Sequence, residues 1–128
     1  MDYNITTIDV DSNWHSIFTQ KTFELTQSGG MHISQRQQAL NFRYRKSLPG
    51  YHSDWHVAGD PTLIAVQAGC IEIKLRNGQT QRFSAGDSFI AADYLPKHTV
   101  FNQQHGHMAK IIGDDEFVAL HFKLGKAP

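Results

Sequence analysis

The sequence predicts a single all-β domain, a jelly roll or closed β-sandwich, and two observations support this. Most of the chain consists of short runs in which apolar and polar residues alternate, the pattern of a half-buried strand. Gly, Asn, Asp and Pro residues separate these runs at the short intervals found in such folds. A chain of 128 residues fits one domain, because halves of it would be too small to bury a stable core.

The expected elements follow in chain order. Residues 11–18 carry apolar side chains at helical spacing behind an Asp/Ser cap, which favours one or two helical turns. The surest strand pair is 71–76 with 79–83, because both flank Asn77-Gly78, a strong hairpin signal. The other expected strands are 40–45, 62–67, 88–92, 98–103, 107–112 and 117–124. Residues 1–40 are then an N-terminal arm of the same domain, which covers a sheet edge or reaches a second subunit, and residues 41–128 form the barrel.

Composition narrows the function. Lys plus Arg and Asp plus Glu both count 12, without a basic stripe, so nucleic acid is not an expected partner. No apolar run approaches the ~20 residues that span a bilayer, and the N-terminus lacks a secretion signal, so we expect a cytoplasmic protein that does not contact membranes. The single cysteine, Cys70, fits a reducing compartment and is expected to be a small buried residue. The 8 histidines direct attention to metal or proton chemistry.

Two groups of residues carry a family resemblance. They are Pro49, Tyr51, Trp55-His56 and Gly69 upstream, and Gly86-Asp87, Pro96, His98 and Asn102 downstream. Through them the chain resembles the cupin superfamily from about Asn41 to Leu124, and within it the small single-domain bacterial cupins, most of which have no assigned activity. The resemblance implies a double-stranded β-helix with a ligand pocket in the barrel mouth, and often a homodimer. Many cupins bind Mn, Fe, Ni or Zn there through a His-x-His pair, a glutamate four or five residues later, and the histidine of the second motif.

Only part of that metal site is present when the motif is aligned on the turn glycine, Gly69. His56 then occupies the place of the first histidine and His98 that of the last. Ala58 stands where the second histidine would be, and Thr62 stands where the glutamate would be. Two of four ligand places are therefore empty, so the resemblance implies weak metal binding, other ligands, or no metal.

A second alignment restores acidic ligands. Asp54 and His56 take the paired places, Asp60 takes that of the glutamate, and His98 completes a set suited to Mn, Fe or Zn. Side chains at i and i+2 of a strand point to the same face, so the first two can share an ion. Against this alignment, Gly59-Asp60-Pro61 is a turn sequence, in which aspartate usually bonds its own backbone.

Several other polar residues have more than one interpretation. Asp93, five residues before His98, either orients that ring or is a turn residue. Glu72 alternates with isoleucines and is expected on a solvated face with charge pairing. His121 shares a face with Ala119 and Lys123, which favours solvent over a subunit contact. The run His105-Gly106-His107 favours a surface turn over the rim of the barrel.

Two hypotheses for the function follow. In the first, the protein is an enzyme in which His56 and His98 weakly hold one divalent transition metal, Mn, Fe, Ni or Zn, for dioxygenase, isomerase or lyase chemistry on a small polar metabolite. In the second, it is a metal-free, non-catalytic binding protein or sensor. In both, Ala58, Thr62, Asp93 and Asn102 are expected pocket residues. A third possibility, acid/base isomerisation of a sugar nucleotide, requires basic residues for the phosphates, and the matched pocket positions carry none.

Overall fold

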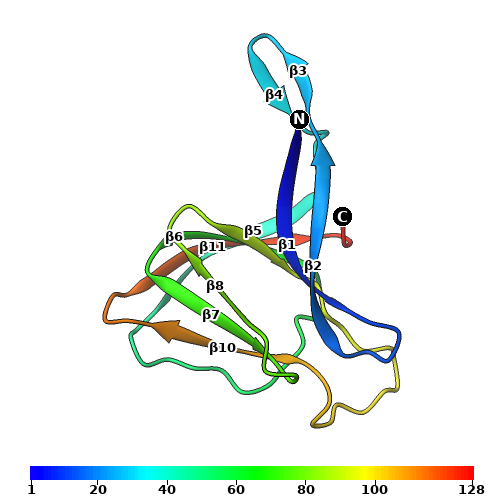
Figure 1. Cartoon of the computed structure of the whole chain (residues 1–128), viewed down its shortest axis with the longest axis vertical. Coiled ribbons are helices and arrows are strands. Elements are labelled where there is room, and N and C mark those ends of the chain that lie inside the picture. Colours follow the sequence, from blue (N-terminus) through cyan, green and yellow to red (C-terminus); the bar gives the residue numbers. More distant parts are fainter.

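The computed structural model describes all 128 residues, which form strands and connecting turns without a helix (Figure 1). No helix capable of crossing a membrane is therefore present. One six-stranded sheet has the order β2-β1-β9-β6-β11-β5, a three-stranded sheet has the order β10-β7-β8, and β3 pairs with β4. The strands are β1 (Asp2–Val10), β2 (Ser16–Glu24), β3 (Thr26–Ser28), β4 (Met31–Ile33), β5 (Ala39–Ser47), β6 (Thr62–Ala68), β7 (Cys70–Leu75), β8 (Thr80–Ser84), β9 (Ser88–Ala91), β10 (His107–Ile112) and β11 (Phe117–Leu124).

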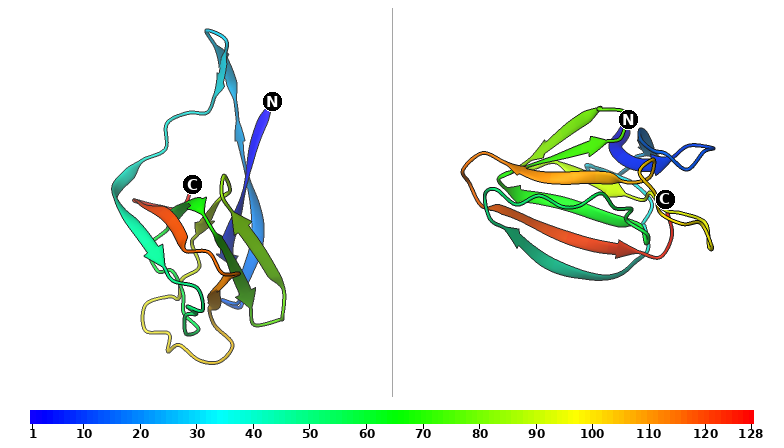
Figure 2. Two further views of the ribbon diagram at one scale, coloured as in Figure 1. Left: turned by 90° about the vertical axis from the view of Figure 1, so that its left-hand side faces the viewer. Right: turned by 90° about the horizontal axis from the view of Figure 1, so that it is seen from below.

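The strand pairing is that of a jelly roll. The eight segments of the barrel are, in chain order, β5, residues 51–56, β6, β7, β8, β9, β10 and β11. The first pairs with the last, the second with the seventh through two isolated bridges, the third with the sixth, and the fourth with the fifth. Winding a long hairpin in this way produces two facing sheets, visible end-on in Figure 2 (right). The predicted double-stranded β-helix is confirmed.

An apolar core fills the space between the sheets. Alternate residues of β7, namely Ile71, Ile73 and Leu75, are buried because successive side chains of a strand point to opposite faces. Phe83 of β8 stacks on Phe89 of β9 across the sandwich, with ring centroids 4.2 Å apart. Thirteen buried residues form this cluster. Six of its members also line a cavity between the sheets: Ile64, Ile71, Ile73, Phe89, Ala91 and Ala109.

The outer face of the small sheet follows the sequence prediction. Asn77-Gly78 closes the β7–β8 hairpin, with Leu75 N donating to Gln79 O (2.9 Å). Glu72 lies on the outer face and forms ion pairs with Arg82 (2.9 Å) and Lys110 (3.7 Å). The lowered pKa of Glu72 follows mainly from the hydrogen bond donated by Arg82.

The N-terminal residues are more regular than expected. β1 pairs with β2 and runs parallel to β9, so it extends the large sheet, and it contributes the buried residues Ile5 and Ile8. The helical turns predicted at residues 11–18 are wrong. Asp11 accepts hydrogen bonds from Asn13 N (2.8 Å) and His15 N (2.9 Å), so it closes a tight turn, and β2 begins directly afterwards. Beyond β2, the β3–β4 hairpin projects away from the barrel (Figure 1; Figure 2, left).

The segment between β9 and β10 also differs from the prediction. The strand expected at 98–103 is wrong, because these residues lie in a loop with turns at Pro96–Thr99 and Asn102–His105. His98 itself has a φ of 73°, which is incompatible with a strand. Val100 is 81% exposed, so the alternating pattern here has no sheet face to pack against.

Candidate ligand-binding cavity

A cavity of about 210 Å³ lies between the two sheets. A wider chamber of about 540 Å³ adjoins it and shares Arg43, Arg45, His56, Ala109 and His121 with it, so the two form one inner cavity and its mouth. The inner part is also lined by Val57, Ala58, Thr62, Ile64, Ile71, Ile73, Phe89, Ala91 and His107, and the mouth by Tyr44, Lys46, Tyr51 and Ser53. A larger hollow of about 900 Å³ beside the β3–β4 hairpin has no buried polar residue on its walls.

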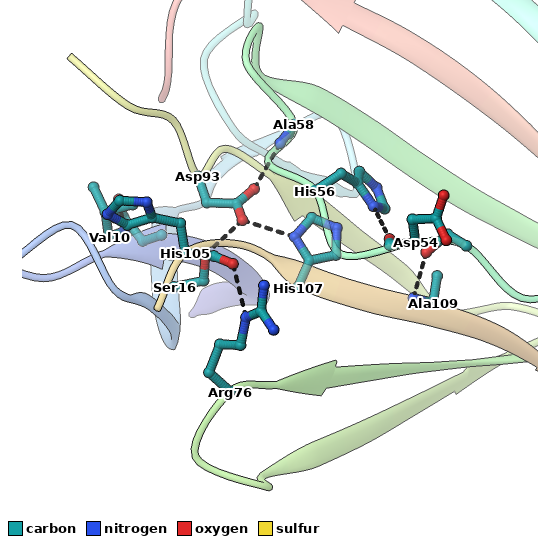
Figure 3. A network of polar contacts seen from close by, with 12 residues as sticks. Val10, Ser16, Asp54, His56, Ala58, Arg76, Asp93, His105, His107 and Ala109 are labelled. Atoms are coloured by element: carbon teal, nitrogen blue, oxygen red, sulfur yellow. Dashed lines mark hydrogen bonds and ion pairs between the residues drawn. The ribbon is translucent and has the colours of Figure 1, made fainter. Parts of the chain in front are cut away.

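Asp93 is the centre of a buried polar network beside this cavity. Its side chain is fully buried and accepts three hydrogen bonds, from Ser16 Oγ (2.6 Å), His107 Nδ1 (2.7 Å) and Ala58 N (2.9 Å). Figure 3 shows the three contacts converging on the carboxylate. Its backbone carbonyl also accepts Gly59 N (3.0 Å). Asp93 therefore ties β2, the 51–61 segment and β10 together at the end of β9.

The same carboxylate determines which nitrogen of the His107 ring is available to a ligand. An ionised carboxylate oxygen only accepts hydrogen bonds, so His107 Nδ1 carries the ring proton and donates a hydrogen bond to Asp93 Oδ2. The lone pair of the neutral ring is then on Nε2. His107 is buried and lines the inner cavity. It is thus fixed in tautomer and orientation by a carboxylate, the arrangement that positions imidazoles in metal sites and acid/base sites.

His56 is held beside His107 in the same way. Its Nδ1 lies 2.8 Å from the carbonyl oxygen of Asp54, an acceptor, so Nδ1 carries the proton and Nε2 is free. The backbones of His56 and His107 exchange two hydrogen bonds, of 2.9 and 2.8 Å, and the ring centroids lie 4.5 Å apart. Figure 3 shows the two rings as neighbours.

Gly106 allows this close approach. Its φ is +84°, and a Cβ placed there would lie 2.6 Å from the carbonyl oxygen of His56. No other residue fits without moving the backbone. The expectation of a surface turn at His105-Gly106-His107 is therefore wrong, because both histidines are buried. His105 accepts a hydrogen bond from Asn102 N (3.0 Å) through Nδ1, and its carbonyl accepts Arg76 Nε (2.9 Å).

Basic residues from the opposite sheet line the mouth. Arg43 and Arg45 alternate with outward residues on β5, and Arg43 lies opposite His121 of β11 in the strand register. The expected solvent position of His121 is wrong, since it lines both parts of the cavity and its Nε2 is buried without a hydrogen-bond partner. Burial, reinforced by Arg45 and then Arg43, lowers the pKa of His121 to about 4. Burial also lowers the pKa of Arg45.

The residues proposed from the sequence divide into two groups. His56, Ala58 and Thr62 line the inner cavity. His98 and Asn102 are exposed in the loop between β9 and β10 and do not line it. Asp93 orients a histidine, but that histidine is His107, and not His98 as the sequence suggested.

The two aspartates of the second alignment do not face the cavity. Asp54 is exposed and contributes only its backbone carbonyl, to His56. Asp60 is exposed at a turn and forms an ion pair with Lys123 (2.9 Å). Its carbonyl also accepts a hydrogen bond from Thr62 Oγ1 (3.2 Å).

The donor groups in the cavity do not fit a resident metal centre of the kind that many cupins contain. No group of three or more His, Cys, Asp or Glu side chains lies close enough to share an ion. His56 and His107 offer two neighbouring imidazole nitrogens, and His121 lines the same cavity but is not close enough to complete a group of three. Asp93 already accepts hydrogen bonds from three donors. Zinc sites in proteins use at least three protein ligands.

Four residues of the cavity were not found from the sequence: Arg43, Arg45, His107 and His121. Arg43 and Arg45 are two residues apart on a predicted strand, which places them on one face, but the face could not be assigned. Gly106 before His107 was a signal for close backbone approach. For His121, the small partner Ala119 on the same face was a sign of burial.

Among known proteins, similarity to this chain is found in solved structures. No protein-family model matches the sequence, and no curated protein was found to be similar to it. Among solved structures, the chain is similar to the Schizosaccharomyces pombe Cnp3 cupin domain, at 13% sequence identity and a TM-score of 0.45, over 95% of this chain and 87% of that chain. The strand pairing described above is what establishes the jelly roll; metal binding, dimerisation and a cytoplasmic location remain predictions.

Proposed function

We propose that this protein binds a small polar metabolite in the cavity between its two sheets, without a resident metal ion. One observation carries the proposal: the neighbouring rings of His56 and His107 each have Nδ1 bonded to an oxygen acceptor, which leaves both Nε2 atoms for a guest. Holding two lone pairs in fixed positions prepares hydrogen bonds to a ligand before it arrives.

The walls of the cavity support this proposal. Its lining combines apolar side chains from both sheets, Ile64, Ile71, Ile73, Phe89 and Ala91, with a small number of polar and charged ones. Small-molecule sites typically combine apolar walls with a few placed polar groups. The inner cavity of about 210 Å³ opens into a mouth of about 540 Å³, and small-molecule sites typically measure about 300–1,000 Å³. The guest is therefore a molecule of metabolite size.

A second function, acid/base catalysis on the bound molecule, is favoured by the Asp93–His107 pair. A buried carboxylate that orients an imidazole is the arrangement of a general base, because it stabilises the ring as it takes up a proton. In that case, Asp93→Asn would abolish turnover of the bound molecule and retain its binding. If the protein only binds, the bound molecule is recovered unchanged from both proteins.

Filling the cavity tests binding directly. Ala109 is buried and lines both parts of the cavity, so Ala109→Leu is expected to displace a ligand, whereas Ala85→Leu, at an exposed turn, is a matched control. Ligand-observed NMR would use a mixture of small organic acids, alcohols, amides and amino acids. We expect saturable binding in wild type and Ala85→Leu and its loss in Ala109→Leu.

Two results would contradict the proposal: no saturable binding by the wild type, or equal binding by Ala109→Leu. A second variant, Thr62→Leu, fills the cavity from β6 and covers the case in which Ala109→Leu does not fold. Circular dichroism and urea unfolding establish that each variant is folded.

A further inference from the structure

We infer that the ligand of this cavity carries a carboxylate or phosphate group, which is bound at the mouth by Arg43, Arg45 and His121. This inference rests on the proposed function and names the chemical class of the ligand. It was not available from the sequence, where the matched pocket positions showed no basic residue.

The three side chains converge from two neighbouring strands. Arg43 and Arg45 stand at i and i+2 of β5, so they share the inward face and their Cα atoms are about 6.6 Å apart. In the register with β11, Arg43 lies opposite His121 and Arg45 opposite the buried Ala119. All three line both the inner cavity and the mouth, so an anion there would lie at the entrance to the His56–His107 region.

The two arginines lack an acidic partner, whereas four of the six other Lys and Arg residues on the strands have one. Neither Arg43 nor Arg45 forms an ion pair, whereas Lys46, Arg82, Lys110 and Lys123 all do. No Asp or Glu lines the inner cavity or the mouth. Arg43 is exposed, but Arg45 is partly buried, and a partly buried cation without a counter-charge is costly to maintain. An anionic ligand would provide the missing charge.

Arg45 is also held in position before any ligand binds. Its guanidinium lies over the rings of Phe117 (5.1 Å) and Tyr51 (5.7 Å), and its Nε donates to Ser47 Oγ (3.1 Å). With Nε occupied, the terminal nitrogens remain as donors. A planar guanidinium fork held in this way matches the two oxygens of a carboxylate or phosphate.

His121 supplies the neutral member of the set. Its Nε2 is buried and has no hydrogen-bond partner within the protein, so it is open to a polar group of a ligand. The lowered pKa of the ring, about 4, keeps it neutral near pH 7, so it can donate one hydrogen bond without adding a third positive charge. The charged groups facing it are Arg43 and Arg45 of β5, and its partner on β6, Ile64, is uncharged.

The experiment compares anions with neutral isosteres. Wild-type protein is titrated at constant ionic strength with acetate, malonate, succinate and inorganic phosphate, and with acetamide, malonamide and succinamide. Side-chain ¹H–¹⁵N spectra report on the histidine rings and the arginine Nε groups. We expect saturable shifts of Arg45 Nε and the His121 ring with at least one anion and not with its amide. Carboxylates and phosphate are separate arms, so the preferred anion is identified.

Variants that remove the positive charges of the arginines make the test specific. Arg43→Gln and Arg45→Gln should each weaken anion binding about 10- to 100-fold, and the double variant more than either, because each lost bond involves two charged groups. The control, Lys74→Gln with Lys97→Gln, removes the same net charge from exposed positions that form no ion pair, and should bind as wild type does. The single variants test the same point if the double variant does not fold.

The outcomes separate this inference from the proposed function. If amides shift the His56 and His107 signals but no anion shifts Arg45 or His121, the cavity binds ligands and the anion site is overturned. Equal anion affinity of wild type and the arginine double variant also overturns it. If no compound shifts any cavity signal, both the inference and the proposed function fail.

Discussion

Replacing Asp93 provides a sharp test of the buried network. In Asp93→Asn, one carboxylate oxygen becomes an amide NH₂ group, and the three donors at Ser16, Ala58 and His107 lose a charged acceptor. Hydrogen bonds to a charged group contribute about 1.5–3 kcal/mol each, against about 1 kcal/mol for neutral pairs. With three bonds affected, the free energy of unfolding should fall by about 2–4 kcal/mol.

Asp93→Ala should be more severe, because it leaves three buried donors without an acceptor, at about 1–3 kcal/mol each. Urea unfolding monitored by the fluorescence of Trp14 and Trp55 measures both losses. Asp60→Asn is the control: its carboxylate is exposed and pairs with Lys123 on the surface, so its loss should cost less than about 1 kcal/mol. If Asp93→Asn costs no more than Asp60→Asn, Asp93 is not the centre of the network.

Three further predictions follow from the cavity. Gly106→Ala should lower the free energy of unfolding by more than the ~1–3 kcal/mol of a strained backbone, because its Cβ would meet the His56 backbone. The control, Gly113→Ala, has a similar φ of +85° and no atom nearby, so it should show the backbone strain alone. Equal urea midpoints of the two variants would refute the close approach of Gly106 to His56. The pKa of His121 falls from 6.5 to about 4 on folding, so the unfolded chain takes up a proton at a higher pH than the folded one. The free energy of unfolding should therefore decrease as the pH drops from about 6.5 to about 4, and decrease less in His121→Gln. Identical pH profiles of unfolding in wild type and His121→Gln would contradict a buried neutral ring. Titration of EDTA-treated protein with Zn²⁺ or Mn²⁺ should show equally weak binding in wild type and His98→Ala by calorimetry; tight stoichiometric binding that requires both His56 and His98 would restore the metal hypothesis.

The fold could be predicted because its signals are local. Alternation along β7 and the Asn77-Gly78 turn are set by neighbouring residues, and the repeated turns between short strands indicate a jelly roll. The place of β1 in the large sheet was missed because its pairing with β9 joins residues about 80 positions apart, which no local pattern reports. The expected strand at 98–103 failed for the converse reason: its alternation is present, but no sheet edge is available to it.

The site was harder to predict because it depends on which face of each strand turns inward. His121 and Arg45 alternate correctly with their neighbours, but alternation alone does not distinguish the inner face from the outer one. An orienting role was one of two interpretations of Asp93, the other being a turn residue, and the expected partner was His98 because it is close in sequence. The backbone pairing of His56 with His107, which Gly106 permits, brings a more distant histidine to it instead.

The tautomers of His56 and His107 test the central claim most directly, since they can be read from ¹⁵N shifts of the side chains in ligand-free protein above neutral pH. The structure predicts that both rings carry the proton on Nδ1, bonded to Asp93 and to the carbonyl of Asp54, with the lone pair on Nε2. A proton on Nε2 of either ring would mean that its Nδ1 is not donating to that oxygen. The two free Nε2 atoms of His56 and His107 that we propose as ligand contacts would then not both be available.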